Sequence, residues 1–346
     1  MPPTGVLTLS TRQLVTRRDL DAEAAEAAVS ALLHETADPL DIAAFLTAMS
    51  AKRPCATEVA ATVRVILAAA RPVAWDGPAV DVVGSGGDGS DSVNISTIAG
   101  LIAAAAGATV AKAGNRAATS SCGSADVLEA LGVPIEPVER VPALLARHRF
   151  AFLFSPAVHP LIGRLAPVRR RLGFRTLFNL AGPLANPVAL DGRLIGAADR
   201  QDQDVLAEAA ALLGLGRTWV VHGHGGLDEL TTSGPNRVLV VDGGTVRETT
   251  VEPAELGLRP AGPDDLRGGG AADNAAAALR ILAGTAPAPV LDTCLFNAAA
   301  VLHLADLAAD LGAGLELARR AVAEARGTDL VRALTAEQPV PVTAAR

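Results

Sequence analysis

The sequence predicts an α/β fold, with a small N-terminal helical domain before a larger domain built on a mainly parallel central sheet. Residues 11–70 carry apolar side chains at helical spacing. Beyond them, short β-type runs alternate with helical segments, which is the order of a parallel sheet covered by helices. The 346 residues are 50% apolar and 19% charged, which suffices for two domains with their own cores. We therefore expect a helical domain over residues 1–76, with a helical contribution from about residues 165–190, and an α/β domain over residues 77–346.

Start and stop signals divide the N-terminal region into separate helices. Pro39 and Pro54 interrupt the helical pattern. Asp38 or Asp41 is placed to cap the helix that begins near residue 40, because a side-chain oxygen accepts a hydrogen bond from a free N–H of the first turn. Thr57 is placed to cap the next helix in the same way.

Six short runs predict the strands of the larger domain. The first, residues 79–83 (AVDVV), is followed by six residues that contain four glycines. The other five runs span residues 108–111, 150–154, 193–196, 218–222 and 238–241. Toward the C-terminus the pattern predicts a mobile loop over residues 263–270, a helix over 271–282, a turn over 284–289 and Ala-rich helix to about residue 334.

Composition excludes several classes of protein. The net charge of −7 and an aromatic content of 3% without tyrosine disfavour a nucleic-acid surface, which needs basic residues or stacking platforms. Three widely spaced cysteines give no disulfide framework. The N-terminus lacks a signal-peptide pattern, and the apolar stretch 95–111 is shorter than the about 20 residues of a membrane span. We expect a cytoplasmic protein without nucleic-acid or membrane partners.

An anion-binding loop is predicted after the first strand. Residues 84–89 (GSGGDG) let an anion approach the main chain closely, because glycine has no side chain. The helix that opens at residues 94–97 (NIST) then directs free N–H groups and the positive end of its dipole toward the loop. Glycine-rich strand-to-helix turns are common, so the loop alone does not identify the anion.

Neighbouring residues narrow the choice of anion. A dinucleotide site needs an acidic residue about 20 positions after the loop, whereas this region offers Lys112 and Arg116. A Walker phosphate loop ends in Gly-Lys-Ser or Gly-Lys-Thr, which residues 88–90 (DGS) do not supply. The two cations and the hydroxyl run 119–121 (TSS) instead supply positive charge and donors for a second phosphate group.

Two adjacent carboxylates, Asp228 and Glu229, follow the strand-like run 218–222 and a Gly-rich turn. Acidic pairs in such turns are often only solvated. Beside a diphosphate, however, they suit Mg²⁺, which binds one or two carboxylates together with phosphate oxygens.

The run 81–133, which includes the glycine loop and Lys112, resembles the phosphoribosyl-diphosphate site of anthranilate phosphoribosyltransferases. The likeness spans about residues 10–335 and continues through residues 154–160, 167–187, 221–234, Asn274-Ala275 and Asn297-Ala298. It implies the nucleoside phosphorylase/phosphoribosyltransferase-like fold. It also implies transfer of the phosphoribosyl group of 5-phosphoribosyl 1-diphosphate to the amine of anthranilate in tryptophan biosynthesis, with Mg²⁺ as the cofactor and a homodimer as the assembly.

The resemblance also implies roles for individual residues. The expected donor-binding residues are Gly84, Gly86, Gly87, Asp88, Ser92, Asn94, Ser96, Thr97, Lys112, Asn115, Arg116, Ser120 and Ser124. The expected metal ligands are Ser96, Asp228 and Glu229. The expected acceptor-binding residues are Gly84, Asn115 and Arg169, the last because a guanidinium clamps a carboxylate through two parallel hydrogen bonds.

Two residues depart from the family pattern. Ser85 stands where the family usually has threonine, and it keeps the hydroxyl group. Ala113 stands where the family's Lys-His-Gly-Asn motif has histidine on the acceptor side, so no general base is assigned. The acceptor's identity therefore stays open between anthranilate and another aromatic acid. A pyrimidine nucleoside phosphorylase is disfavoured by the pair Asp228 and Glu229, and a non-catalytic nucleic-acid-binding paralogue is disfavoured by the net charge of −7.

Overall fold

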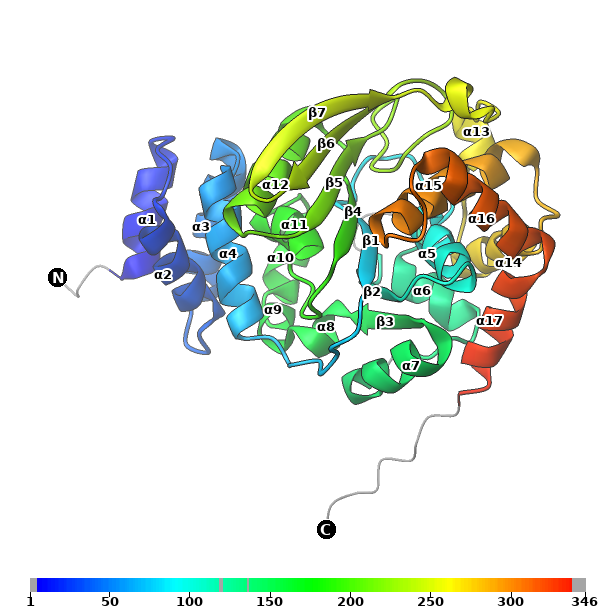
Figure 1. Cartoon of the computed structure of the whole chain (residues 1–346). Coiled ribbons are helices and arrows are strands. Elements are labelled where there is room, and N and C mark those ends of the chain that lie inside the picture. The colour runs from blue at the N-terminus through cyan, green and yellow to red at the C-terminus, as the bar shows by residue number, and fades with distance from the viewer. Residues whose placement is uncertain (1–4, 118–120, 136, 338–346) are drawn as a thin grey trace, which may run out of the picture.

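A single twisted sheet forms the centre of the molecule (Figure 1). In the computed structural model, which describes residues 5–117, 121–135 and 137–337, this sheet has seven strands in the order β3-β2-β1-β4-β5-β6-β7. The strands are β1 Val80–Gly84, β2 Val110–Gly114, β3 Phe150–Phe154, β4 Gly192–Gly196, β5 Arg217–His222, β6 Asn236–Asp242 and β7 Thr245–Val251. Strands β1 to β5 pair in parallel, whereas β6 pairs antiparallel with both β5 and β7.

All six strand runs are confirmed as β1 to β6, and β7 is a strand that the sequence pattern did not predict. It is an edge strand of mostly exposed side chains, TVRETTV, so it lacks a buried apolar face. The tight turn at Gly243 and Gly244, both with positive φ, joins it to β6 as a hairpin. The pair Gly243 and Gly244 was the sequence signal from which this hairpin could have been predicted.

Four helices form the N-terminal domain, on the left of Figure 1: α1 Val6–Val15, α2 Ala22–Leu33, α3 Pro39–Lys52 and α4 Ala56–Ala68. Asp38 caps α3, with its Oδ1 accepting the Leu40 N–H at 2.7 Å. The cap expected at Thr57 is wrong, because α4 begins after Cys55. Glu58 reaches back to the Cys55 N–H at 2.9 Å and so satisfies the start of α4.

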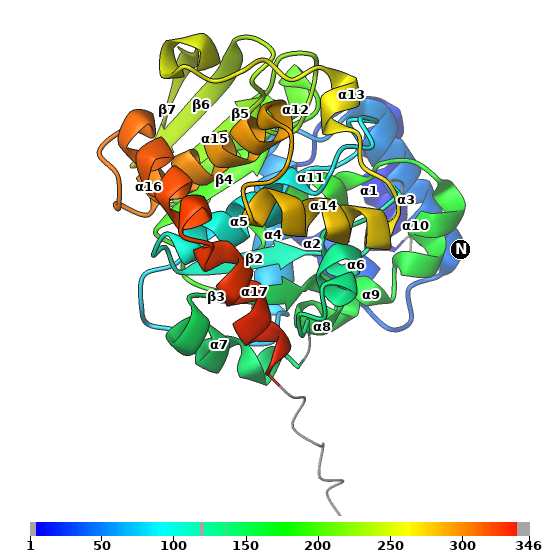
Figure 2. The same ribbon diagram turned by 90° about the vertical axis from the view of Figure 1, so that its right-hand side faces the viewer.

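The remaining helices cover both faces of the sheet (Figure 2). Those before β5 are α5 Ile95–Ala105, α6 Ser124–Ala130, α7 Val141–His148, α8 Ser155–Val158, α9 Pro160–Gly163, α10 Ala166–Leu172, α11 Leu177–Ala181 and α12 Arg200–Leu212. Those after β7 are α13 Pro263–Leu266, α14 Ala271–Leu282, α15 Ala288–Leu304, α16 Leu311–Ala323 and α17 Arg326–Thr335. The short helix α13 occupies the start of the segment expected to be a loop, so that expectation is wrong over residues 263–266.

Two apolar cores lie on the two faces of the sheet. One joins α5, α15 and α16 to the sheet, and includes Leu101, Phe150 and Phe296. The other is shared between the N-terminal helices, α11, α12 and the opposite sheet face, and includes Phe45 and Ile195. The segment with α10 and α11 therefore packs on the N-terminal helices, while its chain neighbours belong to the sheet domain.

The sheet topology places the glycine loop in a crevice. From β1 the chain crosses through α5 to β2 on one side, whereas β4 lies beside β1 on the other side. Parallel sheets bind ligands where the strand order reverses in this way, outside the carboxyl ends of the strands. None of the helices in the described ranges is long and apolar enough to span a membrane.

Candidate active site

The glycine loop after β1 adopts a conformation that needs glycine. Gly86, Gly87 and Gly89 have φ of +68°, +77° and +71°, which side-chain-bearing residues rarely adopt. The Gly86 N–H donates to Asp228 Oδ2 at 2.6 Å, and a Cβ on Gly84 would collide with the same carboxylate. The fold therefore brings the loop and the acidic pair into contact across 142 residues of sequence.

The loop and the N-terminus of α5 enclose a cavity of about 170 Å³, called here the donor cavity. Its lining contains the expected residues Gly84, Gly86, Gly87, Asp88, Ser92, Asn94, Ser96, Ser124, Asp228 and Glu229. Asn94 is held from two sides, by Asn274 Nδ2 at 2.9 Å and by the Cys122 carbonyl at 3.2 Å. The Ser96 N–H donates to Glu229 Oε1 at 3.0 Å.

The acidic pair is electrostatically crowded. Burial, with the nearby charge of Asp88, raises the pKa of Asp228 to about 7. Burial and the charge of Asp228 raise the pKa of Glu229 to about 8, although Lys112 acts in the opposite direction. Two carboxylates with raised pKa values beside the Ser96 hydroxyl form an all-oxygen donor set that fits a hard divalent cation such as Mg²⁺.

Lys112 lies behind the residues that line the donor cavity. Its side chain is fully buried, and Nζ donates to the Val82 carbonyl at 2.5 Å and to Ser96 Oγ at 3.2 Å. Burial lowers the pKa of Lys112, whereas the charges of Asp81 and Glu229 raise it. Within the described part of the chain it lines neither of the two cavities of the site, so it contacts the donor side through Ser96. Thr97 also lines neither cavity, and its side chain is buried.

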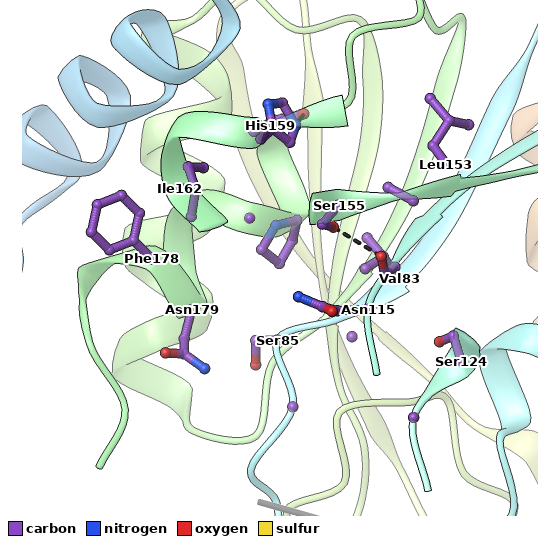
Figure 3. Close-up of a pocket in the computed structure, with 18 of the residues that line it drawn as sticks. Val83, Ser85, Asn115, Ser124, Leu153, Ser155, His159, Ile162, Phe178 and Asn179 are labelled. Atoms are coloured by element: carbon purple, nitrogen blue, oxygen red, sulfur yellow. Dashed lines mark hydrogen bonds between the residues drawn. The ribbon is translucent and has the colours of Figure 1, made fainter. Parts of the chain in front are cut away.

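A second cavity of about 290 Å³, called here the acceptor cavity, adjoins the first and shares Gly84, Gly86, Gly87, Gly123 and Ser124 with it. Figure 3 shows Phe178 and Asn179 on one side of it and Ser124 on the opposite side, with Ser85 and Asn115 between them. A dashed line marks the hydrogen bond from Ser155 Oγ to the Gly114 carbonyl, at 2.9 Å.

Arg169 lines the acceptor cavity, and the surroundings of its guanidinium favour the binding of an anion. Burial lowers the pKa of its guanidinium, which lies 5.4 Å from the centre of the Phe178 ring. Nη2 donates to Asn179 Oδ1 at 3.2 Å, and Arg169 forms no ion pair with any residue that the structure describes. A half-buried guanidinium without an ion-pair partner favours a carboxylate ligand.

Comparisons with known proteins agree with this geometry. The family models described as "Glycosyl transferase family, helical bundle domain" and "Glycosyl transferase family, a/b domain" match residues 10–70 and 76–327. An anthranilate phosphoribosyltransferase of Roseiflexus sp. is 46% identical over 312 residues, which are 90% of this chain and 92% of the relative. The chain belongs to the anthranilate phosphoribosyltransferase family.

Solved structures of the family superpose on this one. The enzyme from Thermus thermophilus gives a TM-score of 0.87 at 40% identity, over 94% of this chain and 98% of that one. The enzyme from Saccharomyces cerevisiae, solved in complex with PRPP (5-phosphoribosyl 1-diphosphate) and Mg, gives 0.86 at 26% identity, over 95% of this chain and 96% of that one. The family, the fold and the enzyme class expected from the sequence are thus confirmed.

Besides Lys112 and Thr97, two more of the expected donor residues do not line the donor cavity. Asn115 and Arg116 line the acceptor cavity instead. The Arg116 guanidinium also pairs with Glu129 at 2.7 Å and lies 4.6 Å from the centre of the Phe154 ring. Ser120 lies outside the described residues.

The structure adds residues to which sequence patterns assign no role. Asn179 faces Arg169, and its Oδ1 also accepts the Thr176 N–H at 3.0 Å, so the start of α11 orients it. Asn274 opens α14 and positions Asn94, as described above. Both are asparagines in the first turn of a helix, and this position was the sequence signal from which a role in the site could have been suspected. Their cavity-facing role depends on packing between distant segments.

Proposed function

We propose that this enzyme joins the amine of anthranilate to C1 of the ribose of 5-phosphoribosyl 1-diphosphate, with release of diphosphate, in tryptophan biosynthesis. The observation that carries the proposal is the pair of adjoining cavities, which have four glycines and Ser124 in common. One is built from loop N–H groups, a helix N-terminus and carboxylates, which suit a metal-bound polyphosphate. The other contains the half-buried Arg169 guanidinium, which has no ion pair among the described residues and suits a benzoate carboxylate.

The donor would lie in the first cavity. The loop glycines and Asn94, Ser96 and Ser124 supply its hydrogen-bonding surface, with Lys112 behind Ser96. Ser96, Asp228 and Glu229 would hold Mg²⁺, which neutralises charge on the diphosphate when bound. The relative crystallised with PRPP and Mg supports this cofactor.

The chain's own residues contribute mainly positioning. In the reaction the bond from C1 to the diphosphate oxygen breaks, a bond from C1 to the amine nitrogen forms with inversion, and the amine loses a proton. An aromatic amine is a poor nucleophile, so the leaving group departs largely before attack and the sugar becomes oxocarbenium-like. Arg169 and Asn179 orient the acceptor, and the shared glycine loop sets the distance between the two substrates. No residue is assigned as the general base.

Ala113 supports a second candidate, in which the acceptor is a different aromatic acid. It lines the acceptor cavity with a methyl group where the family motif has an imidazole. The test is to incubate the protein with 5-phosphoribosyl 1-diphosphate, Mg²⁺ and a panel of aminobenzoates, and to follow the loss of anthranilate fluorescence. Rapid loss of fluorescence supports anthranilate. Preferential consumption of another aminobenzoate would overturn that acceptor and leave the donor assignment in place.

We also propose a domain boundary near residue 76. The N-terminal domain is further proposed to form the interface of a homodimer. Four large apolar side chains are exposed on α1 and α3: Val6 at 46%, Leu9 at 55%, Val15 at 69% and Leu40 at 77%. A groove of about 580 Å³ runs between the same two helices. Clustered exposed apolar residues of this kind favour association with a second copy.

A further inference from the structure

Arg175 lies where three parts of the molecule meet. It belongs to the connection between α10 and α11, and its carbonyl accepts a hydrogen bond from Ser50 Oγ of α3 at 3.1 Å. Its Nη1 pairs with Asp202 Oδ2, near the start of α12, at 3.0 Å. The residue therefore has fixed contacts with both the N-terminal helices and the sheet domain.

The side chain of Arg175 also lies against the glycine loop. A Cβ added to Gly87 would lie 2.9 Å from Arg175 Cδ and 3.3 Å from Nε. The loop main chain comes this close to Arg175 only because Gly87 has no side chain. Its φ of +77° is a second reason why this position favours glycine. The stem of Arg175 thus forms a surface on which the loop rests.

Two donors of this guanidinium have no partner. Nε and Nη2 are both buried, and neither is hydrogen-bonded to any residue in the described ranges. Leaving a buried donor unpaired is costly, and an arginine fork favours oxygen acceptors in its plane.

We propose that Arg175 is a positioning residue of the donor site, which holds the glycine loop in the conformation that binds the diphosphate. This inference rests on the proposed function. In the donor-bound state, carbonyl oxygens of the loop turn toward Nε and Nη2 and give these donors their missing partners. Because Asp202 fixes the other side of the guanidinium, the loop is positioned relative to α12 and the sheet.

Arg53 provides a matched control. Its Nη2 pairs with Asp202 Oδ1 at 3.1 Å and with Asp199 Oδ1 at 3.0 Å, so it shares the anchor of Arg175. It lines neither the donor nor the acceptor cavity in the described structure. Arg53→Gln and Arg175→Gln therefore each remove an arginine bound to Asp202, but only the second removes the support under the loop.

The test compares the wild type, Arg175→Gln and Arg53→Gln by calorimetric Kd for each substrate, by kcat and KM, and by melting temperature. Arg175→Gln is expected to raise the Kd and KM for 5-phosphoribosyl 1-diphosphate with Mg²⁺ by about tenfold, and those for anthranilate by less than about twofold. Arg53→Gln is expected to leave all four within about twofold of the wild type. Arg175→Lys, which keeps the charge but lacks the fork, is expected to fall between the wild type and Arg175→Gln, and it replaces that variant if the glutamine protein does not fold.

Three results would overturn the inference: unchanged donor binding in Arg175→Gln, an equal loss of acceptor binding, or the same donor defect in Arg53→Gln. Failure of the proposed function is a separate outcome. It would appear as a wild-type protein that binds no donor and has no transferase activity, before any variant is made.

Discussion

We propose that Arg169 determines which substrate the acceptor cavity takes. Its guanidinium is desolvated and lacks a carboxylate partner in the described structure, so its electrostatic requirement is left for a ligand. Arg169→Ala is expected to raise the KM for anthranilate by about 10- to 100-fold, because two charge-assisted hydrogen bonds are lost. The KM for 5-phosphoribosyl 1-diphosphate should change little. Initial rates at saturating concentrations of the other substrate measure both values.

Arg171 gives the matched control for this prediction. It lies two residues away on the same helix, α10, but is exposed and outside the acceptor cavity. Arg171→Ala should leave both KM values unchanged. An equal rise in the KM for anthranilate in both variants would mean that the overall charge of α10, rather than the Arg169 fork, attracts the acceptor.

Asp228 and Glu229 allow a prediction with a readout besides activity. Replacing both with alanine should lower turnover severely, and added Mg²⁺ should recover little of it. Without Mg²⁺ the double variant should melt no lower than the wild type, because their raised pKa values show that the folded state disfavours both charges. Mg²⁺ should raise the melting temperature of the wild type only, since a ligand stabilises the state that binds it. Near-normal kinetics, or an equal Mg²⁺ effect on both proteins, would refute the metal assignment.

At the scale of elements, Glu58 joins three segments of the N-terminal domain. Its carboxylate is fully buried and accepts the N–H groups of Leu20 and Cys55, both at 2.9 Å, and the Lys52 ammonium at 2.8 Å. Lys52 also pairs with Asp19 at 2.5 Å, so its ammonium occupies the space among Asp19, Cys55 and Glu58. This acidic cluster is therefore already neutralised by a lysine.

Removing that carboxylate should be costly. Glu58→Ala is expected to lower the free energy of unfolding by about 3 kcal/mol, because it leaves the Lys52 ammonium and two N–H groups buried with fewer partners. Asp19→Ala is the control, and it should cost no more than about 1 kcal/mol because the Asp19 side chain is 63% exposed. Urea denaturation followed by circular dichroism measures both. Equal losses in the two variants would show that the cluster acts only through its net charge.

Elements that carry their own local signal were predictable from the sequence. Strand β3, with five buried apolar residues, and helix α14, which follows three glycines, have the predicted bounds. Strand β7 was not predictable from hydrophobic pattern, because an exposed edge strand has no buried face to reveal it. The α4 cap at Cys55 was missed because Glu58, rather than a hydroxyl residue, satisfies the helix start.

The candidate site shows the same division. The glycine loop carried its own sequence signal, whereas the position of Asp228 beside it was expected from the family resemblance and is seen in the contact with Gly86. The indirect position of Lys112 depends on the depth of β2 in the sheet, and the burial of Thr97 depends on which face α5 turns inward. The pairing of Asn179 with Arg169 depends on the packing of α11 against α10. Burial and side-chain pairing of this kind depend on tertiary packing, so no motif of fixed sequence spacing predicts them.

At the scale of the whole molecule, the two cavities have different origins. The donor cavity is built mainly from loops at the carboxyl edge of the sheet, whereas Arg169 and Phe178 come from the segment packed on the N-terminal helices. In the proposed mechanism, the N-terminal domain therefore supports the acceptor side of the site. Its outer surface, formed by α1 and α3, is free for assembly.

The proposed dimer gives the prediction at this scale. Val15→Glu with Leu40→Glu should convert the protein to a monomer in sedimentation equilibrium, because burying two carboxylates in an apolar interface is unfavourable. The side chains are 69% and 77% exposed in the single chain, so the monomer fold should persist by circular dichroism. Leu212→Glu on α12 is the control, since that residue is 57% exposed on another helix and should leave the dimer intact. A wild type that sediments as a monomer at micromolar concentrations would refute the dimer, and dissociation caused by Leu212→Glu would place the interface on α12.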